Sequence, residues 1–145
     1  MNWKSVIRFR KQVEDMVREE LALAEWDKSQ EQARRESFQE DMHQISLELE
    51  DQLPHGVSGS FVEERFRWLE EAGYALERQA SVLAGHDQKI AGIRDKLREA
   101  YQARRVIEIL SARQRTALMR RVSKYEQRQQ EEAAAFRYVA GWDKA

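Results

Sequence analysis

Histidine and carboxylate side chains are the groups of this chain that could bind a metal or transfer a proton. His43, His55 and His86 lie in separate parts of the sequence. A structural metal site needs three or four converging ligands, and the carboxylates of di-iron proteins act from the core of a four-helix bundle. Neither arrangement is indicated, so the sequence predicts no metal site and no cofactor.

Catalytic motifs are also missing from the sequence. It contains no glycine-rich phosphate loop, no nucleophile elbow and no His-Glu-x-x-His motif. It has no cysteine, which excludes a disulfide framework, a thiolate metal site and a cysteine nucleophile. Two long helices would provide no concave substrate pocket. We therefore expect that the protein is not an enzyme.

Basic side chains gather in the last third of the chain and could bind a partner. Phosphate contacts of nucleic acids need little more than such a surface. The solvated face of a coiled coil and a docking site for an acidic protein surface are the alternatives. The sequence pI is about 6.3, whereas nucleic-acid-binding domains are usually strongly basic, so we expect no nucleic-acid partner. The basic residues are Arg113, Arg115, Arg120, Arg121, Lys124 and Arg128.

Composition favours long helices that are exposed to water. Of the 145 residues, 35% are charged and 41% are hydrophobic, the mean hydropathy is −0.83, and one proline and six glycines leave few places for turns. The N-terminal residues lack the apolar region of a signal peptide, and no stretch approaches the length of a transmembrane helix. We expect a soluble cytoplasmic protein without a transmembrane segment.

One break interrupts this pattern, in the stretch LEDQLPHGVSGSF. The residue before a proline is disfavoured in the α region, so Pro54 predicts that the first helix ends at or before Leu53. Gly56 and Gly59 could both adopt positive φ. The sequence therefore predicts a bend at residues 54–59.

Apolar residues recur at steps of three and four in the first helix, which should run from about Trp3 to Leu53. Two groups mark its apolar face: Val6, Phe9, Val13 and Met16, and then Phe38, Met42, Ile45, Leu49 and Leu53. Residues 25–37 between these groups offer only Trp26 and Ala33 as apolar residues.

The second helix should run from about Ser60 to Arg137, followed by a frayed tail at residues 138–145. Ser60 and Glu63 form the capping box that begins it. Its strongest signal is a seven-residue repeat typical of coiled coils. One register contains Leu83, Ile90, Leu97, Arg104, Ser111, Leu118 and Tyr125, a second contains Ile93, Ala100 and Ile107, and Val106, Leu110, Ala117 and Val122 widen the stripe.

An amphipathic helix cannot bury its apolar face alone, and a short loop favours antiparallel neighbours. We therefore predict an all-α fold in which two long helices form an antiparallel coiled-coil hairpin, as a single domain over the whole chain. Folding about the bend would set Phe38 beside Tyr74 and Val6 beside Val106. Roughly 30 residues from Ile107 onward, about 45 Å of helix, would have no partner in the chain. That overhang predicts a surface for another protein, a dimer contact or simple fraying.

Charge is unevenly distributed, although the net charge is −1. Residues 36–77 contain eleven Asp and Glu against two Arg, whereas residues 104–128 contain eight Lys and Arg against two Glu. Residues 1–11 add four cations and no acid. A hairpin would bring the two basic segments together and place the acidic segment at the bend, which predicts an electrically polar molecule.

These features resemble those of the FliJ family, soluble components of the flagellar type III export apparatus. The resemblance covers most of the chain. It is clearest in GVSGSFVEERFRWLEEAGYALERQASVL and in KLREAYQARRVIEILSARQRTALMRRVSKYEQRQQEEAAAF, where a leucine-punctuated stretch precedes a Gln- and Glu-rich helix end. The stalk proteins of injectisomes share this architecture and are the alternative. A structural coiled coil that forms homodimers through the overhang is a further, less favoured one.

The resemblance implies a cytoplasmic stalk and adaptor, peripherally associated with the inner-membrane export apparatus. The two termini would bind the hexameric export ATPase, the hairpin would contact the cytoplasmic domain of the export gate, and the protein would escort export chaperones. For Trp68, packing between the helices and binding to a partner protein are equally favoured. Position implies gate contacts at Phe38, Asp41, Ile45, Trp68, Ala72, Ala75 and Gln79, and ATPase contacts at Phe9, Val13, Leu110, Arg113, Leu118, Arg121, Val122 and Tyr125.

Overall fold

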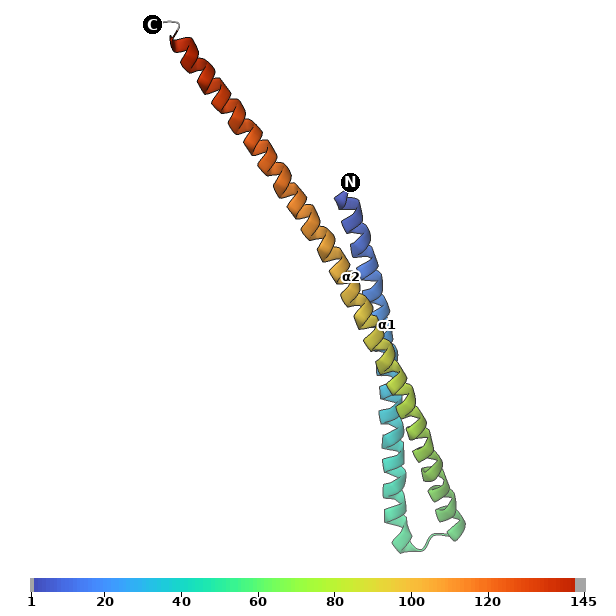
Figure 1. Ribbon diagram of the computed structural model, residues 1–145. Helices are drawn as coiled ribbons and strands as arrows, with labels where there is room; N and C mark the ends of the chain where they lie inside the picture. Colours follow the sequence, from blue (N-terminus) through green and yellow to red (C-terminus); the bar gives the residue numbers. More distant parts are fainter. Residues whose placement is uncertain (1, 143–145) are drawn as a thin grey trace. The chain divides into compact units, whose positions relative to one another are not determined.

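The computed structural model describes residues 2–142, which are helical almost throughout. Helix α1 spans Trp3–Gln52, a short 3-10 helix η1 spans Leu53–His55, and α2 spans Gly59–Trp142. No strand occurs among the described residues, and the bend joins the two long helices (Figure 1). The predicted all-α hairpin of two long helices is confirmed.

The bend begins where proline stops the first helix. Gln52 is the last residue of α1, and Pro54 lies in η1. Gly56 adopts the left-handed conformation, with φ of 78°, and its N–H donates to the carbonyl oxygen of Leu53 at 3.4 Å. A residue with a Cβ would be strained at this φ, so glycine suits the position that ends η1.

The start of α2 differs from the prediction. Gly59 is its first residue and has no positive φ. The backbone N–H of Phe61 donates to the hydroxyl oxygen of Ser58 at 3.3 Å. Ser58 therefore caps α2 in place of the expected box of Ser60 and Glu63, because its side chain reaches the free N–H of the third helical residue.

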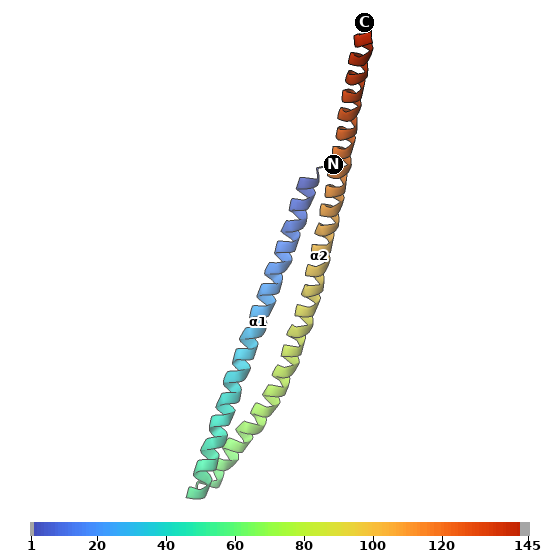
Figure 2. The same cartoon turned by 90° about the vertical axis from the view of Figure 1, so that its left-hand side faces the viewer.

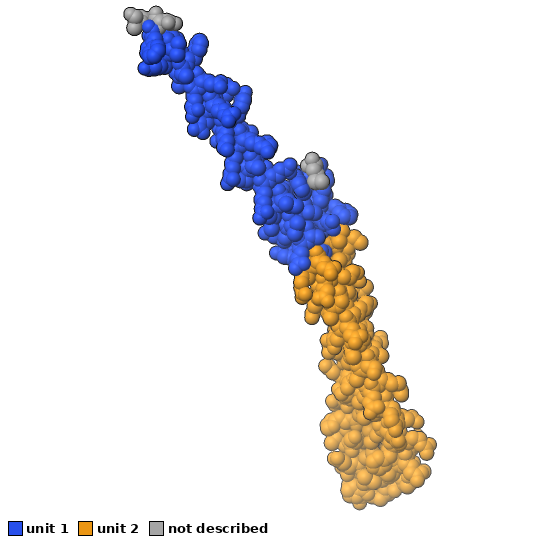
Figure 3. Space-filling view, in the orientation of Figure 1, with its two compact units in different colours: residues 1–12, 100–145 blue, residues 13–99 orange. Residues whose placement is uncertain are grey.

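The chain divides into two compact units, which are coloured separately in Figure 3. Residues 1–12 and 100–145 form the first, which we call the terminal unit. Residues 13–99 form the second, which we call the hairpin unit because it contains the bend.

The hairpin unit has an apolar core between its two helices. Burial of these side chains is the main favourable term that holds two amphipathic helices together. The buried members are Val17, Ala24, Ile90 and Ile93, with Leu21 and Leu97 packed against them.

Ion pairs across the hairpin unit define its antiparallel register. Nζ of Lys28 lies 2.6 Å from Oδ1 of Asp87, and Nζ of Lys96 lies 3.3 Å from Oε2 of Glu20. Residue numbers therefore fall along α1 as they rise along α2, which Figure 2 also shows for these segments. Exposed ion pairs contribute only about 0–1 kcal/mol each, so they report the register more than they stabilise it.

The buried face of α1 follows two seven-residue repeats, and part of the predicted face lies outside them. Phe9 and Met16 are 58% and 68% exposed. The face that contacts α2 passes one position further along the chain, through Arg10 and Val17. Leu53, expected at the end of the face, is exposed in η1. The partly or fully buried members of the two repeats are Trp3, Arg10, Val17, Ala24, Glu31, Phe38 and Ile45, and Ile7, Glu14, Leu21, Lys28, Arg35, Met42 and Leu49.

The predicted seven-residue repeat of α2 is confirmed up to Ser111. Ile90, Ile93 and Ser111 are buried, and the other members before that residue are partly buried. Leu118 and Tyr125, the last members of the repeat, are 60% and 64% exposed. We call the contact between the repeats of α1 and α2 the seam.

The buried face of α2 is narrower than predicted. A single partner helix covers the two seam positions of each heptad and leaves the flanking positions in water. The residues that were expected to widen the stripe, Val106, Leu110, Ala117 and Val122, are all exposed.

In the terminal unit, the helices pair further along α2 than predicted. The indole N–H of Trp3 donates to Oε1 of Gln114, whereas Val106, expected beside Val6, is 55% exposed. The pairing follows the seven-residue repeats rather than the midpoint of the bend. The contact with α1 therefore extends to Gln114, and the overhang begins after it, at residues 115–142, instead of at Ile107.

Helix α2 also ends later than predicted. It continues through Trp142, although residues 138–142 were expected to fray, and residues 143–145 lie outside the described residues. The ring centroids of Tyr138 and Trp142, one helical turn apart, are separated by 5.2 Å. Such contacts at i,i+4 support a helix, as do the alanines that precede them in the sequence.

The core of the hairpin unit can be tested by truncating one buried side chain. Ile93 is 4% exposed, so Ile93→Ala should lower the free energy of unfolding by about 2–5 kcal/mol. Urea denaturation followed by far-UV circular dichroism measures this change. Val82 is 49% exposed, so the control Val82→Ala should stay within about 0.5 kcal/mol of the parent. Equal losses in both variants would contradict the assigned core.

Candidate functional site

Aromatic residues mark one candidate surface, in the part of the hairpin unit near the bend. The ring centroids of Phe38 in α1 and Trp68 in α2 lie 5.9 Å apart. Tyr74, which the prediction placed beside Phe38, is instead 55% exposed. Trp68 is partly buried, so it packs against α1 and leaves part of its surface accessible.

The other residues that the resemblance assigned to the export gate differ in accessibility. Asp41 is exposed, and Ile45 and Ala75 are partly buried. Ala72 is 3% exposed, so a partner could reach it only if the helices separated. The structure thus brings Phe38 and Trp68 together at an accessible place, but it puts Ala72 inside the seam.

Gln79, the last of these gate residues, places an unsatisfied polar atom in the seam. Its Oε1 is buried and has no hydrogen-bond partner within the described part of the chain. Leu76 lies one turn before Gln79 in α2. Its carbonyl oxygen accepts a hydrogen bond from Nη1 of Arg35 in α1 at 3.2 Å. A buried acceptor without a donor costs about 1–3 kcal/mol.

Exposed carboxylates surround this part of the hairpin unit. Residues 36–77 contain eleven acidic side chains and two arginines. Among the described residues, their one ion pair joins Nη2 of Arg65 to Oε1 of Glu48 at 3.7 Å. The remaining negative charge is uncompensated and would attract a basic partner.

The overhang is the second candidate surface. It exposes Leu118 and Tyr125, and Val122 is 47% exposed. The cations between them, which include Arg121, form no ion pair with any residue in the described range. An apolar stripe flanked by unpaired cations is suited to contact with another protein.

Four residues assigned to the ATPase precede the overhang. Leu110 and Arg113 are exposed on α2, and Phe9 is exposed on α1. Val13 is partly buried. The structure therefore leaves all of the assigned ATPase residues accessible except for part of Val13.

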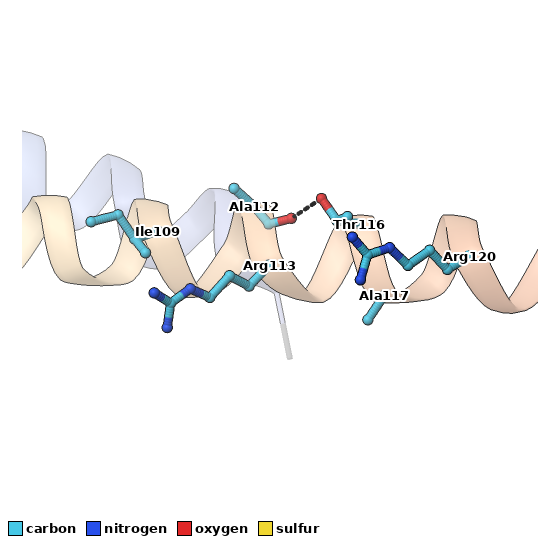
Figure 4. Close-up of a pocket in the computed structure, with 6 residues that line it drawn as sticks. All are labelled: Ile109, Ala112, Arg113, Thr116, Ala117 and Arg120. Atoms are coloured by element: carbon cyan, nitrogen blue, oxygen red, sulfur yellow. Dashed lines mark hydrogen bonds between the residues drawn. The ribbon is translucent and has the colours of Figure 1, made fainter.

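Open depressions occur on the terminal unit. Exposed residues of α2 line one of them entirely. There the hydroxyl group of Thr116 donates to the carbonyl oxygen of Ala112 at 3.0 Å, and the side chains of Arg113 and Arg120 run along the helix toward its N-terminal end (Figure 4). A shallow, open depression of this kind is better suited to contact with another protein than to binding a small molecule, which is usually held in an enclosed pocket.

A charged cluster in the terminal unit was missed at the level of sequence. Oε1 of Glu108 accepts from Arg104 and its Oε2 accepts from Arg105, both at 2.7 Å. These hydrogen bonds hold the pKa of Glu108 below its ordinary value, and the bond from Arg104 is the larger cause. The guanidinium of Arg104 also lies 5.2 Å from the ring centroid of Tyr101. The spacing of these residues at i,i+3 and i,i+4 was the signal that could have revealed the cluster.

A buried charge in α1 was also missed. Glu14 is 2% exposed, and Nη2 of Arg18 lies 2.7 Å from its Oε1. Charged side chains are seldom buried unless they are paired. Glu14 falls seven residues from both Ile7 and Leu21, so the repeat alone would have placed it in the seam.

The histidines take no part in a metal centre within the described residues. Nδ1 of His55, in η1, lies 2.8 Å from the carbonyl oxygen of Asp51 in the last turn of α1. No group of three or more potential metal ligands occurs in residues 2–142. Over the same range, no helix is both long enough and apolar enough to cross a membrane.

Two paired helices, a bend near the first third of the chain and a second helix that extends past the first agree with one known family. The family model described as flagellar FliJ protein matches residues 3–141. The chain belongs to the FliJ family. Comparison with curated proteins and with solved structures finds no significant match.

Membership of the FliJ family makes the chain a component of the flagellar export apparatus. FliJ proteins are non-catalytic components of that apparatus, which agrees with a chain whose candidate sites are exposed helix faces. The overhang and the surface near Trp68 are therefore candidate protein-docking surfaces.

Replacing Gln79 tests whether its unsatisfied acceptor destabilises this FliJ chain. Gln79→Leu keeps a similar volume and removes the buried Oε1, so the free energy of unfolding should rise by about 1–3 kcal/mol. Chemical denaturation measures the change. Gln88 is exposed, and the control Gln88→Leu should have a much smaller effect. A loss of stability in Gln79→Leu would mean that the amide is satisfied in solution.

The Arg104–Glu108 contact predicts a pH dependence. Because the pKa of Glu108 is lowered in the folded chain, its contribution to stability is present above the unfolded pKa and is lost as pH falls through the folded pKa. Arg104→Gln should raise the pKa of Glu108 toward the ordinary value. Carboxyl-carbon NMR measures the titration directly. Arg121→Gln, a control in the overhang, should leave the pKa of Glu108 unchanged; a shift there would contradict a local cause.

Proposed function

We propose that this FliJ-family chain is the central stalk and adaptor between the hexameric export ATPase and the export gate, and that it escorts export chaperones. The observation that carries the proposal is the overhang. Its seven-residue repeat continues past the end of α1 through Leu118 and Tyr125, which are exposed. A repeat of this kind is built to pack against protein, and the export ATPase is the partner that the family suggests.

The hairpin unit supplies the second contact of the proposed adaptor. Trp68 and Phe38 form an aromatic pair, and partly exposed tryptophans often dominate the binding energy of an interface. The surrounding carboxylates would orient a basic partner. The cytoplasmic domain of the export gate is the proposed partner here, which would associate the protein peripherally with the inner membrane.

The stalk protein of an injectisome is the alternative function. It would use the same two surfaces in a virulence-type secretion system. The family match is to flagellar FliJ proteins over residues 3–141, and this observation favours the flagellar system.

Titration of the purified chain into the flagellar export ATPase tests the proposal. The measurements are the rate of ATP hydrolysis and the assembly of the ATPase ring. Faster hydrolysis with ring formation is expected. A helical, soluble chain that changes neither quantity would contradict the stalk function.

Substitutions in the overhang should separate docking from folding. Leu118→Asp and Tyr125→Asp should each weaken ATPase binding by about tenfold or more, because a charge replaces an apolar contact. Helix content and unfolding of the hairpin unit should be unchanged, since both residues are exposed. Val82→Asp is a matched control, because Val82 is an exposed residue of α2 outside the overhang. Full stimulation by both overhang variants would rule out this docking surface.

A further inference from the structure

A stripe of alternating acidic and aromatic side chains runs along an exposed face of α2 in the hairpin unit. Phe66 and Tyr74 are 54% and 55% exposed. The carboxylates beside them recur every seven residues and are all exposed. We call this set the acidic stripe: Glu63, Phe66, Glu70, Tyr74 and Glu77.

The overhang carries a second stripe of similar design and opposite charge. Leu118 and Tyr125 are exposed, and an arginine follows each of them three residues later. Steps of three and four keep all four residues on one helix face. We call this set the basic stripe: Leu118, Arg121, Tyr125 and Arg128.

The spacings of the two stripes match. Arg121 and Arg128 are seven residues apart, as are Glu70 and Glu77, which corresponds to about 10.5 Å along a helix. Two helices that wind around each other keep a seven-residue repeat in register. Each arginine could therefore meet a carboxylate while the apolar members of the stripes pack between them.

The charges of the two stripes are not paired within the described residues. Their five charged residues form no side-chain hydrogen bond or ion pair with any residue that the structure describes. Some charges in the middle of the helices are instead paired across them, as in Lys28–Asp87 and Arg94–Glu25. The net charge is only −1, so long-range repulsion between two copies is weak.

We propose that the basic stripe of one copy binds the acidic stripe of a second copy. The contact joins two different surfaces, so it is heterologous and links the copies head to tail. It depends on charge and should weaken as salt screens the ion pairs. It goes beyond the stalk function, and its test uses the purified chain alone, so the two proposals can fail separately.

Sedimentation velocity of the full chain over a range of micromolar concentrations measures the association. At about 0.1 M salt the average mass should rise with concentration, and at about 1 M salt it should return to that of a monomer. A chain that stays monomeric at low salt overturns the proposal. Association that persists at high salt overturns it too, because it would reflect apolar contact alone.

Two charge-reversal variants identify the surfaces. The double variant Arg121→Glu with Arg128→Glu, and the double variant Glu70→Lys with Glu77→Lys, should each associate at least about tenfold more weakly, because like charges then face each other. A mixture of the two variants should associate again, since the reversed stripes are complementary. Far-UV circular dichroism checks that both remain helical.

Controls separate this contact from other modes of association. Lys89→Glu changes an exposed cation of α2 outside both stripes, and it should leave the association unchanged. If the variant of Glu70 and Glu77 still associates like the parent, the copies join through their overhangs and the proposal is wrong. Failure of the mixture to associate would also overturn it.

Discussion

The narrow seam between α1 and α2 is the constraint on which the rest of the structure depends. A helix that faces one partner buries only two positions in each heptad. The buried apolar residues of the described chain are therefore few, namely Val17, Ala24, Leu49, Ala72, Ile90 and Ile93. Most side chains of a two-helix protein must remain in water, which accounts for the 35% of charged residues. The function must consequently be carried on exposed faces.

The seam is also chemically uneven. An apolar stretch around Ile90 and Ile93 is followed, toward the bend, by a polar stretch that contains Lys28, Arg35 and the unsatisfied Gln79. Polar seam residues fix the register at a cost in stability. Helices joined by a weaker seam separate locally at a lower free energy. The part of the hairpin unit that contains Trp68 is thus bounded by a seam that is easier to open than the apolar core.

The sequence was sufficient for the fold and for the seven-residue repeat of α2 up to Ser111, because that repeat is carried by large apolar residues such as Ile90. It was insufficient for α1, whose repeat passes through Arg10, Glu14 and Lys28 and so looks polar. Simple steps of three and four selected Phe9 in place of Arg10, since a hydrophobic pattern cannot recognise a charged residue that lies on the contact face.

The same limitation explains why the overhang was expected to begin too early. Counting residues from the bend assumes that residues equally distant from it lie opposite each other. The side-chain repeats instead decide which residues are paired, as Trp3 and Gln114 are. Exposure of the assigned residues was predicted for some of them and not for others. Exposure of Leu118 and Tyr125 follows from the lengths of the two helices, but burial of Ala72 depends on a rotation of α2 that position alone did not fix.

The overhang, as a proposed protein-docking surface, faces two opposing requirements. It needs exposed apolar residues for its partner, and these same residues promote aggregation when the partner is absent. The cations between them oppose aggregation of one overhang with another, because two basic faces repel each other. They also leave the acidic stripe of another copy as the complementary surface. A contact of that kind would be weak and sensitive to salt, and a stronger partner that covers Leu118 and Tyr125 would displace it by mass action. Opposite charges on the overhang and near the bend would thus keep the proposed docking surface from aggregating. The surface would still remain accessible to a partner.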